Sequence, residues 1–224
     1  MHERFHERFL VELTERLFAH FTGGAWRAPL GARQLPVVRA SGARPGARLG
    51  QIVCAEAADV ARARGLLRAG GPPGEGSFDP AALAAALAAD APLLAGLRTE
   101  EGFAQDRFDV PASVDLPAGG PLVLLSAAGT PVDLVVGALI AGAARGLIWK
   151  PAPAAAASAH AIMRALGPRA GGRLALLQGD HATGQLLVGP VHVGQGGLVW
   201  AAPGPLPADL PPALILPARA PARR

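Results

Sequence analysis

One stretch of the sequence constrains the fold more than any other. Residues 121–151 read PLVLLSAAGTPVDLVVGALIAGAARGLIWKP. The apolar runs and turn residues predict a buried strand, a helix of small side chains and a second buried strand, at Leu122–Leu125, Val132–Ala144 and Leu147–Trp149. A strand, a crossover helix and a strand within about thirty residues form a βαβ unit, whose two strands lie parallel in one sheet.

The second strand of this unit ends at Lys150, which is the only lysine of the chain. Pro151 follows it and stops the strand. Open parallel sheets bind their ligands outside the carboxyl ends of the strands, so Lys150 stands where a ligand is expected. One interpretation is an exposed lysine at the strand end whose stem packs on the sheet edge.

These features resemble the cofactor-binding domain of the aldehyde dehydrogenase superfamily. In that family a strand ending in Pro-Trp-Asn-x-Pro leads through a small-residue helix to a strand ending in Lys-Pro-Ser-Glu. Three further segments of this chain are similar to the family: FTGGAW at 21–26, the alanine-rich 51–68, and LALLQGDHATG at 174–184. The resemblance covers about residues 21–202 and implies a three-layer Rossmann-like α/β domain.

The resemblance also implies a vestigial cofactor site. In the family the lysine and a glutamate three residues later hold the ribose, but here the second position is Pro153, which offers no acceptor. His181 stands where the family has a glycine that admits the adenine. We therefore expect no NAD(P) binding or only weak binding, and the candidate cofactor-binding residues are Ser126, Gly129, Lys150, Pro151, Gly179 and Gly184.

The resemblance implies no catalytic residue in this chain. The family's cysteine nucleophile belongs to a second domain and its general-base glutamate to a later segment, neither of which corresponds to these residues. The oxyanion asparagine falls at Gly129, which has no amide side chain. Cys54 lies ahead of the cofactor motifs, and we interpret it as a small buried residue. The prediction leans against an enzyme.

Composition excludes several other classes. The 224 residues suit one domain, and the net charge of +4 comes from scattered arginines without interleaved aromatics, which does not favour nucleic-acid binding. A single cysteine excludes an intrachain disulfide, and His2 and His6 have no third metal ligand nearby. The charged N-terminus is not a signal peptide, and Leu134–Ala144 is too short to span a bilayer. We expect a cytoplasmic protein.

The clearest amphipathic helix is predicted over residues 2–21. Phe5, Phe9, Leu13 and Leu17 recur every four residues, and charged residues occupy the other side. The apolar stripe has two possible partners: the chain's own domain, or another chain bound by helix-in-groove recognition.

The remaining elements follow from turn residues and apolar runs. We expect a hairpin of Leu35–Val38 and Leu49–Ala55, and a last strand at Gly197–Trp200. Helices are predicted over 59–68, from Asp79-Pro80 onwards, from Pro92 to Gly102, and over 154–166 and 183–188. The strand between the last two helices is predicted at 173–177, and 214–216 adds an optional strand to a Pro/Ala/Arg-rich tail.

The predicted organisation is an amphipathic helix at 1–20, an aldehyde-dehydrogenase-like α/β domain at 21–202 and a tail at 203–224. The predicted function is a non-catalytic structural or regulatory partner of a full-length aldehyde dehydrogenase or a related pathway enzyme, in a homo- or hetero-oligomer. One alternative is a minimal NAD(P)-binding oxidoreductase subunit. Another is a scaffold or cargo protein docked through its N-terminal helix.

Overall fold

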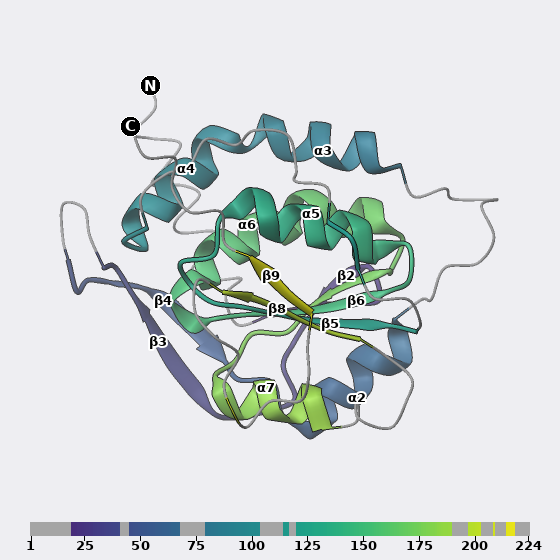
Figure 1. The fold of residues 1–224 in the computed structure, drawn as a ribbon. Helices are drawn as coiled ribbons and strands as arrows, with labels where there is room; N and C mark the ends of the chain where they lie inside the picture. Colours follow the sequence, from purple (N-terminus) through teal and green to yellow (C-terminus); the bar gives the residue numbers. More distant parts are fainter. Residues whose placement is uncertain are drawn as a thin grey trace.

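The computed structural model of the chain describes residues 19–40, 45–67, 79–103, 114–116, 120–189, 197–202, 208 and 214–217. In these residues a seven-stranded sheet carries helices on both faces, and a two-stranded hairpin lies beside it (Figure 1). This is the three-layer α/β architecture that the sequence predicts. The predicted N-terminal helix falls almost entirely on residues 1–18, outside the described residues.

The large sheet has the strand order β2-β1-β7-β6-β5-β8-β9. Its strands are His20–Thr22 (β1), Ala25–Arg27 (β2), Leu122–Ser126 (β5), Leu147–Pro151 (β6), Leu174–Leu176 (β7), Gly197–Ala202 (β8) and Leu214–Pro217 (β9). Strands β5 to β9 are parallel, whereas β1 is antiparallel to both β2 and β7. From β5 the chain builds β6 and β7 on one side and returns to place β8 on the other. The crevice outside β5 and β8 is therefore the expected ligand position.

The predicted βαβ unit is confirmed. Strands β5 and β6 pair in parallel with Leu124 opposite Trp149, and α5 (Val132–Ala143) joins them. Small residues let this helix approach the sheet closely, because a Cβ on Gly142 would lie 2.3 Å from Leu147 Cδ1. The strand predicted for the tail is also present as β9, at the edge of the sheet.

The prediction that the first helix continues to residue 21 is wrong, because His20–Thr22 forms β1. Phe21 pairs with Leu176 of β7 and with Trp26 of β2, and its side chain is buried. Gly23 and Gly24 form the turn between β1 and β2 with φ of 61° and 80°, a conformation that glycine adopts without strain. The aromatic spacing of the sequence fits a helix, but burial of Phe21 and pairing with β7 decide for a strand.

The predicted hairpin consists of β3 (Gln34–Val38) and β4 (Arg48–Val53). It lies off the large sheet, on the side where the parallel strands end (Figure 1). Backbone hydrogen bonds anchor its base: Cys54 N–H donates to the Arg33 carbonyl at 2.7 Å, and Ala55 N–H donates to the Gln178 carbonyl at 2.8 Å. The hairpin is therefore tied to the loop that follows β7.

Helices cover the sheet unequally (Figure 1). One face carries α5 and α6 (Ala156–Leu166), over which lie α3 (Pro80–Ala89) and α4 (Ala91–Glu100). The other face carries only α2 (Ala57–Leu66) and α7 (His181–Val188) among the described helices. The predicted cap is present, since the Asp79 carboxylate accepts the Ala81 N–H at 2.9 Å. Two 3-10 turns flank α6, at Pro153–Ala155 and Gly167–Ala170.

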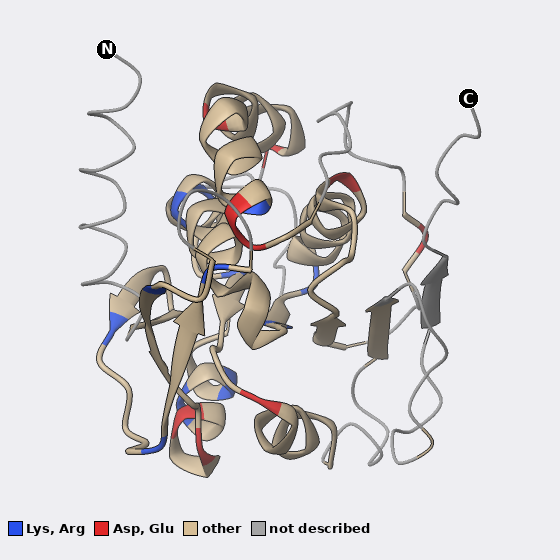
Figure 2. Cartoon of the chain, turned by 90° about the vertical axis from the view of Figure 1, so that its left-hand side faces the viewer, with Lys and Arg blue, Asp and Glu red and all other residues tan. Residues whose placement is uncertain are grey.

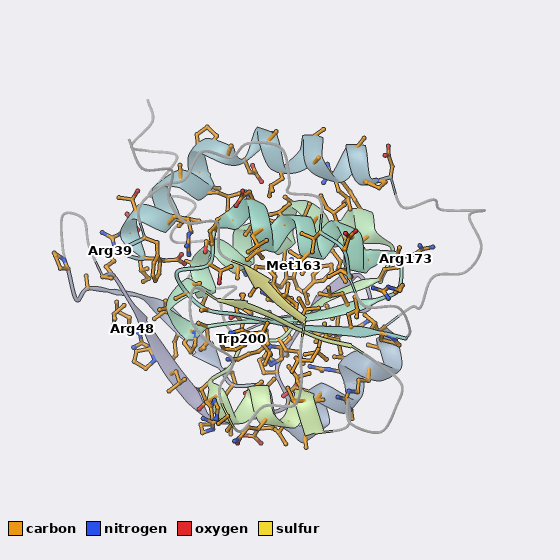
Figure 3. The ribbon with its side chains drawn as sticks, viewed as in Figure 1. Arg39, Arg48, Met163, Arg173 and Trp200 are labelled. Atoms are coloured by element: carbon orange, nitrogen blue, oxygen red, sulfur yellow. The ribbon has the colours of Figure 1, made fainter. Side chains whose placement is uncertain are left out.

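Each face of the sheet buries its own apolar cluster, as alternation along the strands requires. On the α5/α6 face the larger cluster includes Leu122, Leu124, Trp149, Ile162 and Met163, the last of which is labelled in Figure 3. On the α2/α7 face the smaller cluster includes Val60, Val123, Leu125, Ile148, Leu177, Leu187 and Leu198. No single helix within the described ranges has the length and apolar character to cross a membrane, although α3 and α4, bent by 63° at their junction, have that length and apolar composition together.

Candidate functional site

The six candidate residues lie together at the carboxyl edge of the parallel sheet. Ser126 and Pro151 end β5 and β6 and stand opposite each other in the register. Gly129 lies in the turn before α5, and Gly179 lies between β7 and α7. Gly184 sits in α7 beneath β5, where a Cβ would lie 4.0 Å from Leu125 Cδ1. Figure 3 shows the two ends of the sheet, with Arg173 at the amino end of β7 and Trp200 towards the opposite end.

Lys150 is buried, with 8% of its surface exposed, so the interpretation of an exposed strand-end lysine is wrong. Alternation along β6 places its side chain on the same face as Ile148, beside its register partner Leu125. Burial lowers the pKa of Lys150 to about 8, against the attraction of Asp180 and Cys54. Its ammonium makes no hydrogen bond or ion pair with the described part of the chain.

Asp180 already has partners. Its carboxylate forms a two-point ion pair with the Arg33 guanidinium, in which Nη2 donates to Oδ1 at 3.0 Å. It also caps α7, accepting the Thr183 N–H at 3.3 Å. These contacts, the Arg33 hydrogen bond foremost, lower the pKa of Asp180 to about 2. Because Arg33 holds the carboxylate, Asp180 does not form an ion pair with Lys150.

Cys54 is fully buried at the base of the hairpin, as the sequence predicts. Burial raises the pKa of its thiol, while the positive charges of Arg33 and Lys150 oppose that rise. A nucleophilic cysteine needs an accessible thiolate, and this environment favours the protonated, enclosed thiol.

The polar atoms of the β5–α5 turn are also engaged from inside the protein. Ser126 Oγ accepts the Trp149 Nε1–H at 2.9 Å. Arg98, from α4, donates to the carbonyl oxygens of Ala128 at 2.7 Å and Thr130 at 3.2 Å. The guanidinium lies 4.5 Å from the centre of the Phe103 ring. Gly129 itself is exposed and has no side chain that could donate a hydrogen bond at this turn.

A buried polar cluster that the sequence analysis missed supports this turn. Glu101 accepts hydrogen bonds from the backbone N–H of Ser158 at 2.8 Å and from its hydroxyl at 2.7 Å. Arg98 Nη1 lies 3.4 Å from the Glu101 carboxylate. Burial raises the pKa of Glu101 to about 7, against these hydrogen bonds. The sequence offers only an Arg and a Glu three residues apart near a helix end, a spacing equally typical of a solvated ion pair.

A second missed cluster fixes the loop that carries Arg33. The buried Asp59 carboxylate accepts the N–H groups of Leu30 at 2.9 Å and Gly31 at 3.0 Å, and pairs with Arg62 at 2.8 Å. His20 faces Asp59 across 3.9 Å, and burial lowers the pKa of this histidine to about 4. Its Nδ1 accepts the Gln178 N–H at 3.3 Å. Asp59 and His20 thus hold the Arg33 loop and the β7–α7 loop near each other.

The remaining charges and histidines do not gather into a further site. Figure 2 shows positive and negative residues interspersed over the described elements rather than collected on one of them. His160 stacks on Trp26 with ring centres 4.2 Å apart, and His181 is exposed at the start of α7. Over the described ranges, no three His, Cys, Asp or Glu side chains are placed to hold a metal ion. His2 and His6 lie outside those ranges.

Three solved structures illustrate what this arrangement resembles. The chain matches the Delta-pyrroline-5-carboxylate dehydrogenase of Mycobacterium tuberculosis, bound with NAD and cobalamin, at 20% identity and a TM-score of 0.59, covering 87% of this chain and 45% of that one. It matches aldehyde dehydrogenase C of Pseudomonas syringae, in complex with NAD+ and octanal, at 17% identity and a TM-score of 0.64. The match covers 83% of this chain and 45% of that one. A benzaldehyde dehydrogenase of Corynebacterium glutamicum matches at 16% identity and a TM-score of 0.61 (82% and 49% covered).

The fold is that of an aldehyde dehydrogenase cofactor-binding domain. This confirms the resemblance found in the sequence at the level of the fold, and the chain spans just under half the length of these dehydrogenases. No protein-family model matches the sequence, and no curated protein matches it.

Proposed function

We propose that this chain is a non-catalytic protein with the aldehyde dehydrogenase fold that acts as a structural or regulatory partner, either of a full-length aldehyde dehydrogenase or of another enzyme of the same pathway. Its carboxyl edge keeps the architecture of a cofactor site while its polar groups serve the protein itself.

The observation that carries the proposal is the internal pairing of the edge. Ser126 accepts from Trp149, and the carbonyl oxygens of the β5–α5 turn accept from Arg98. Asp180 is paired with Arg33 and caps α7. A ligand that competed for these groups would have to replace hydrogen bonds that the fold already has, which removes most of the gain in affinity.

The residues fit the dinucleotide of the fold family poorly. A ribose needs an acceptor beside the lysine, and Pro153 of the 3-10 turn supplies none. His181 places an imidazole at the start of α7, where a glycine would leave room for an adenine. Of the six candidate residues, only Lys150 offers a polar side-chain group without a partner in the described residues.

The affinity for NAD or NADP tests the proposal. Losing one or two charge-assisted hydrogen bonds, each contributing about 1.5–3 kcal/mol, lowers affinity by about tenfold to about twenty-thousand-fold. We expect dissociation constants of about 1 mM or weaker by isothermal titration calorimetry. Micromolar binding that disappears in Lys150→Ala, while an exposed control such as Arg169→Ala retains it, would contradict the proposal.

That outcome would support the alternative of a minimal NAD(P)-binding subunit. Two observations favour it: the Lys150 ammonium lies unpaired at the strand end, and the solved neighbours include complexes with NAD. A subunit of this kind would deliver its dinucleotide to a catalytic domain on another chain.

Identifying the partner requires the protein in its native host. We expect affinity purification of the full chain to recover an aldehyde dehydrogenase or a neighbouring pathway enzyme. Recovery that depends on the stripe of Phe5, Phe9, Leu13 and Leu17 alone would favour the second alternative, a scaffold or cargo protein docked through its N-terminal helix. Recovery of a uniform monomer with no companion would contradict both partner hypotheses.

A further inference from the structure

Lys150 has a combination of properties that the proposed function does not use. It is the only lysine of the chain, it is 8% exposed, and it precedes the last residue of β6, at the carboxyl edge of the parallel strands where open sheets bind ligands. A buried ammonium normally pairs with a carboxylate, because an unpaired buried charge is costly. Asp180 is the nearby carboxylate, and Arg33 already holds it.

The nitrogen itself retains contact with solvent. It makes no hydrogen bond in the described residues, yet it is not among the fully enclosed side-chain atoms that lack a partner. The stem packs beside apolar side chains, since Leu125 is its register partner and Leu177 N–H donates to the carbonyl of the preceding residue, Trp149, at 3.0 Å. A small molecule reaching the nitrogen would thus meet an amine in a mainly apolar wall.

We propose that Lys150 is a reactive amine that captures small aldehydes as imines. The neutral Nζ attacks the carbonyl carbon and forms the C–N bond of a carbinolamine. Loss of the former carbonyl oxygen as water then gives the C=N bond, and the proton released from nitrogen balances the step. No oxidant or cofactor is needed, and the inference does not depend on the proposed partner role.

Burial, and not the charges around Lys150, favours the neutral amine. Burial lowers its pKa to about 8, so a substantial fraction is uncharged near neutral pH. The ionisable groups that act on it are Asp180 and Cys54, and both oppose this effect. Arg33 weakens the influence of Asp180 by pairing with it.

Reductive trapping tests the proposal directly, because a single lysine makes the product unambiguous. The full chain is incubated at pH 7.5 with propanal and sodium cyanoborohydride, which reduces an imine to a stable secondary amine, and the Lys150 peptide is weighed by mass spectrometry. A synthetic peptide of residues 146–153 with an acetylated N-terminus, so that the lysine is its only amine, gives the rate of an ordinary lysine. From the lower pKa we expect Lys150 in the folded chain to react at least about tenfold faster.

Two variants locate the effect. Lys150→Arg keeps the charge and should abolish the adduct. Arg33→Gln frees Asp180 to pair with Lys150 and should slow trapping severalfold, and Arg33 is exposed enough that its replacement is compatible with folding. A folded-chain rate no higher than that of the peptide, or a rate that does not change in Arg33→Gln, would overturn the proposal.

Discussion

At the scale of single residues, two ionisable side chains are held in surroundings that oppose their charged forms. Lys150 lies at the end of β6 and Glu101 beneath the β5–α5 turn, and burial is the first cause of both pKa shifts. Burial lowers the pKa of the lysine and raises the pKa of the glutamate, so the two residues change the stability of the fold in different pH ranges. Each can be tested by a substitution that keeps its shape.

Lys150→Met should stabilise the protein at neutral pH. The pKa of Lys150 is about 8 in the folded chain and 10.5 without the fold, so the charged lysine destabilises the folded state below pH 8. The penalty is relieved as the pH rises from 8 to 10.5. We expect a gain in unfolding free energy of up to about 3 kcal/mol at pH 7 that fades by pH 10.5, measured by chemical denaturation. A gain independent of pH would show that packing rather than charge is responsible.

Glu101→Gln should remove a pH dependence of the opposite kind. The pKa of Glu101 is about 7 in the folded chain and 4.5 without the fold, so the folded state binds the extra proton between these values. Its contribution to stability is present below pH 4.5 and is lost as the pH rises to 7. The unfolding free energy of the wild type minus that of the variant should therefore fall by up to about 3 kcal/mol as the pH rises from 4.5 to 7. An unchanged difference across these pH values would argue against the raised pKa.

At the scale of elements, glycines set how closely a helix can approach its neighbours around the candidate site. Gly179 precedes α7, and a Cβ there would lie 2.1 Å from Thr183 Oγ1 and 2.6 Å from Thr183 Cβ. Gly184 lies inside α7, where a Cβ would meet Leu125 Cδ1 at an ordinary 4.0 Å. Both glycines belong to the predicted cofactor turn, but only Gly179 lies where a Cβ would clash with its surroundings.

Alanine substitutions should therefore have opposite effects at these two positions. Gly179→Ala should lower the unfolding free energy by about 1–3 kcal/mol, because Thr183 must leave its hydrogen bond to the Ala55 carbonyl. Gly184→Ala should raise it by up to about 1 kcal/mol, because alanine is the better helix former. Thermal and chemical unfolding of the two variants measure both effects, and loss of stability in both would mean that α7 packs more tightly than these distances indicate.

At the scale of the whole molecule, the open question is what covers the N-terminal apolar stripe. A buried Phe or Leu contributes about 1.5–3 kcal/mol, and a helix of about twenty residues is marginal alone in water. The stripe therefore needs a partner surface, on its own domain or on another chain. The two arrangements differ in whether the stripe supports folding or assembly.

The double change Phe9→Asp with Leu13→Asp separates these arrangements without shortening the chain. We expect the variant to stay folded and to lose its oligomer or its partner, as measured by light scattering and thermal melting. The control Arg8→Ala with Arg16→Ala alters the net charge by the same amount on the polar side of the predicted helix. A variant that melts at a markedly lower temperature, with its assembly unchanged, would place the stripe against its own domain.

The local order of apolar runs and turn residues was enough to predict most of the fold. The βαβ unit, the hairpin, the Asp79-Pro80 helix start and the β9 strand follow from patterns within a few residues of each other. The six candidate residues could be placed at one edge because parallel strands end together. The strand at His20–Thr22 could not be predicted from local patterns, since its pairing with β7 joins residues about 150 positions apart.

Which polar groups at that edge are already satisfied was decided by tertiary structure alone. Arg33 reaches Asp180, Arg98 reaches the β5–α5 turn, and Glu101 reaches Ser158, each from an element distant in the sequence. The sequence determines that Lys150 lies near the end of a parallel strand, at the carboxyl edge of the sheet. Its burial and its lack of an ion pair depend on the hairpin, the β7–α7 loop and Arg33 meeting in space, because electrostatic environment is a property of distances that local pattern does not encode.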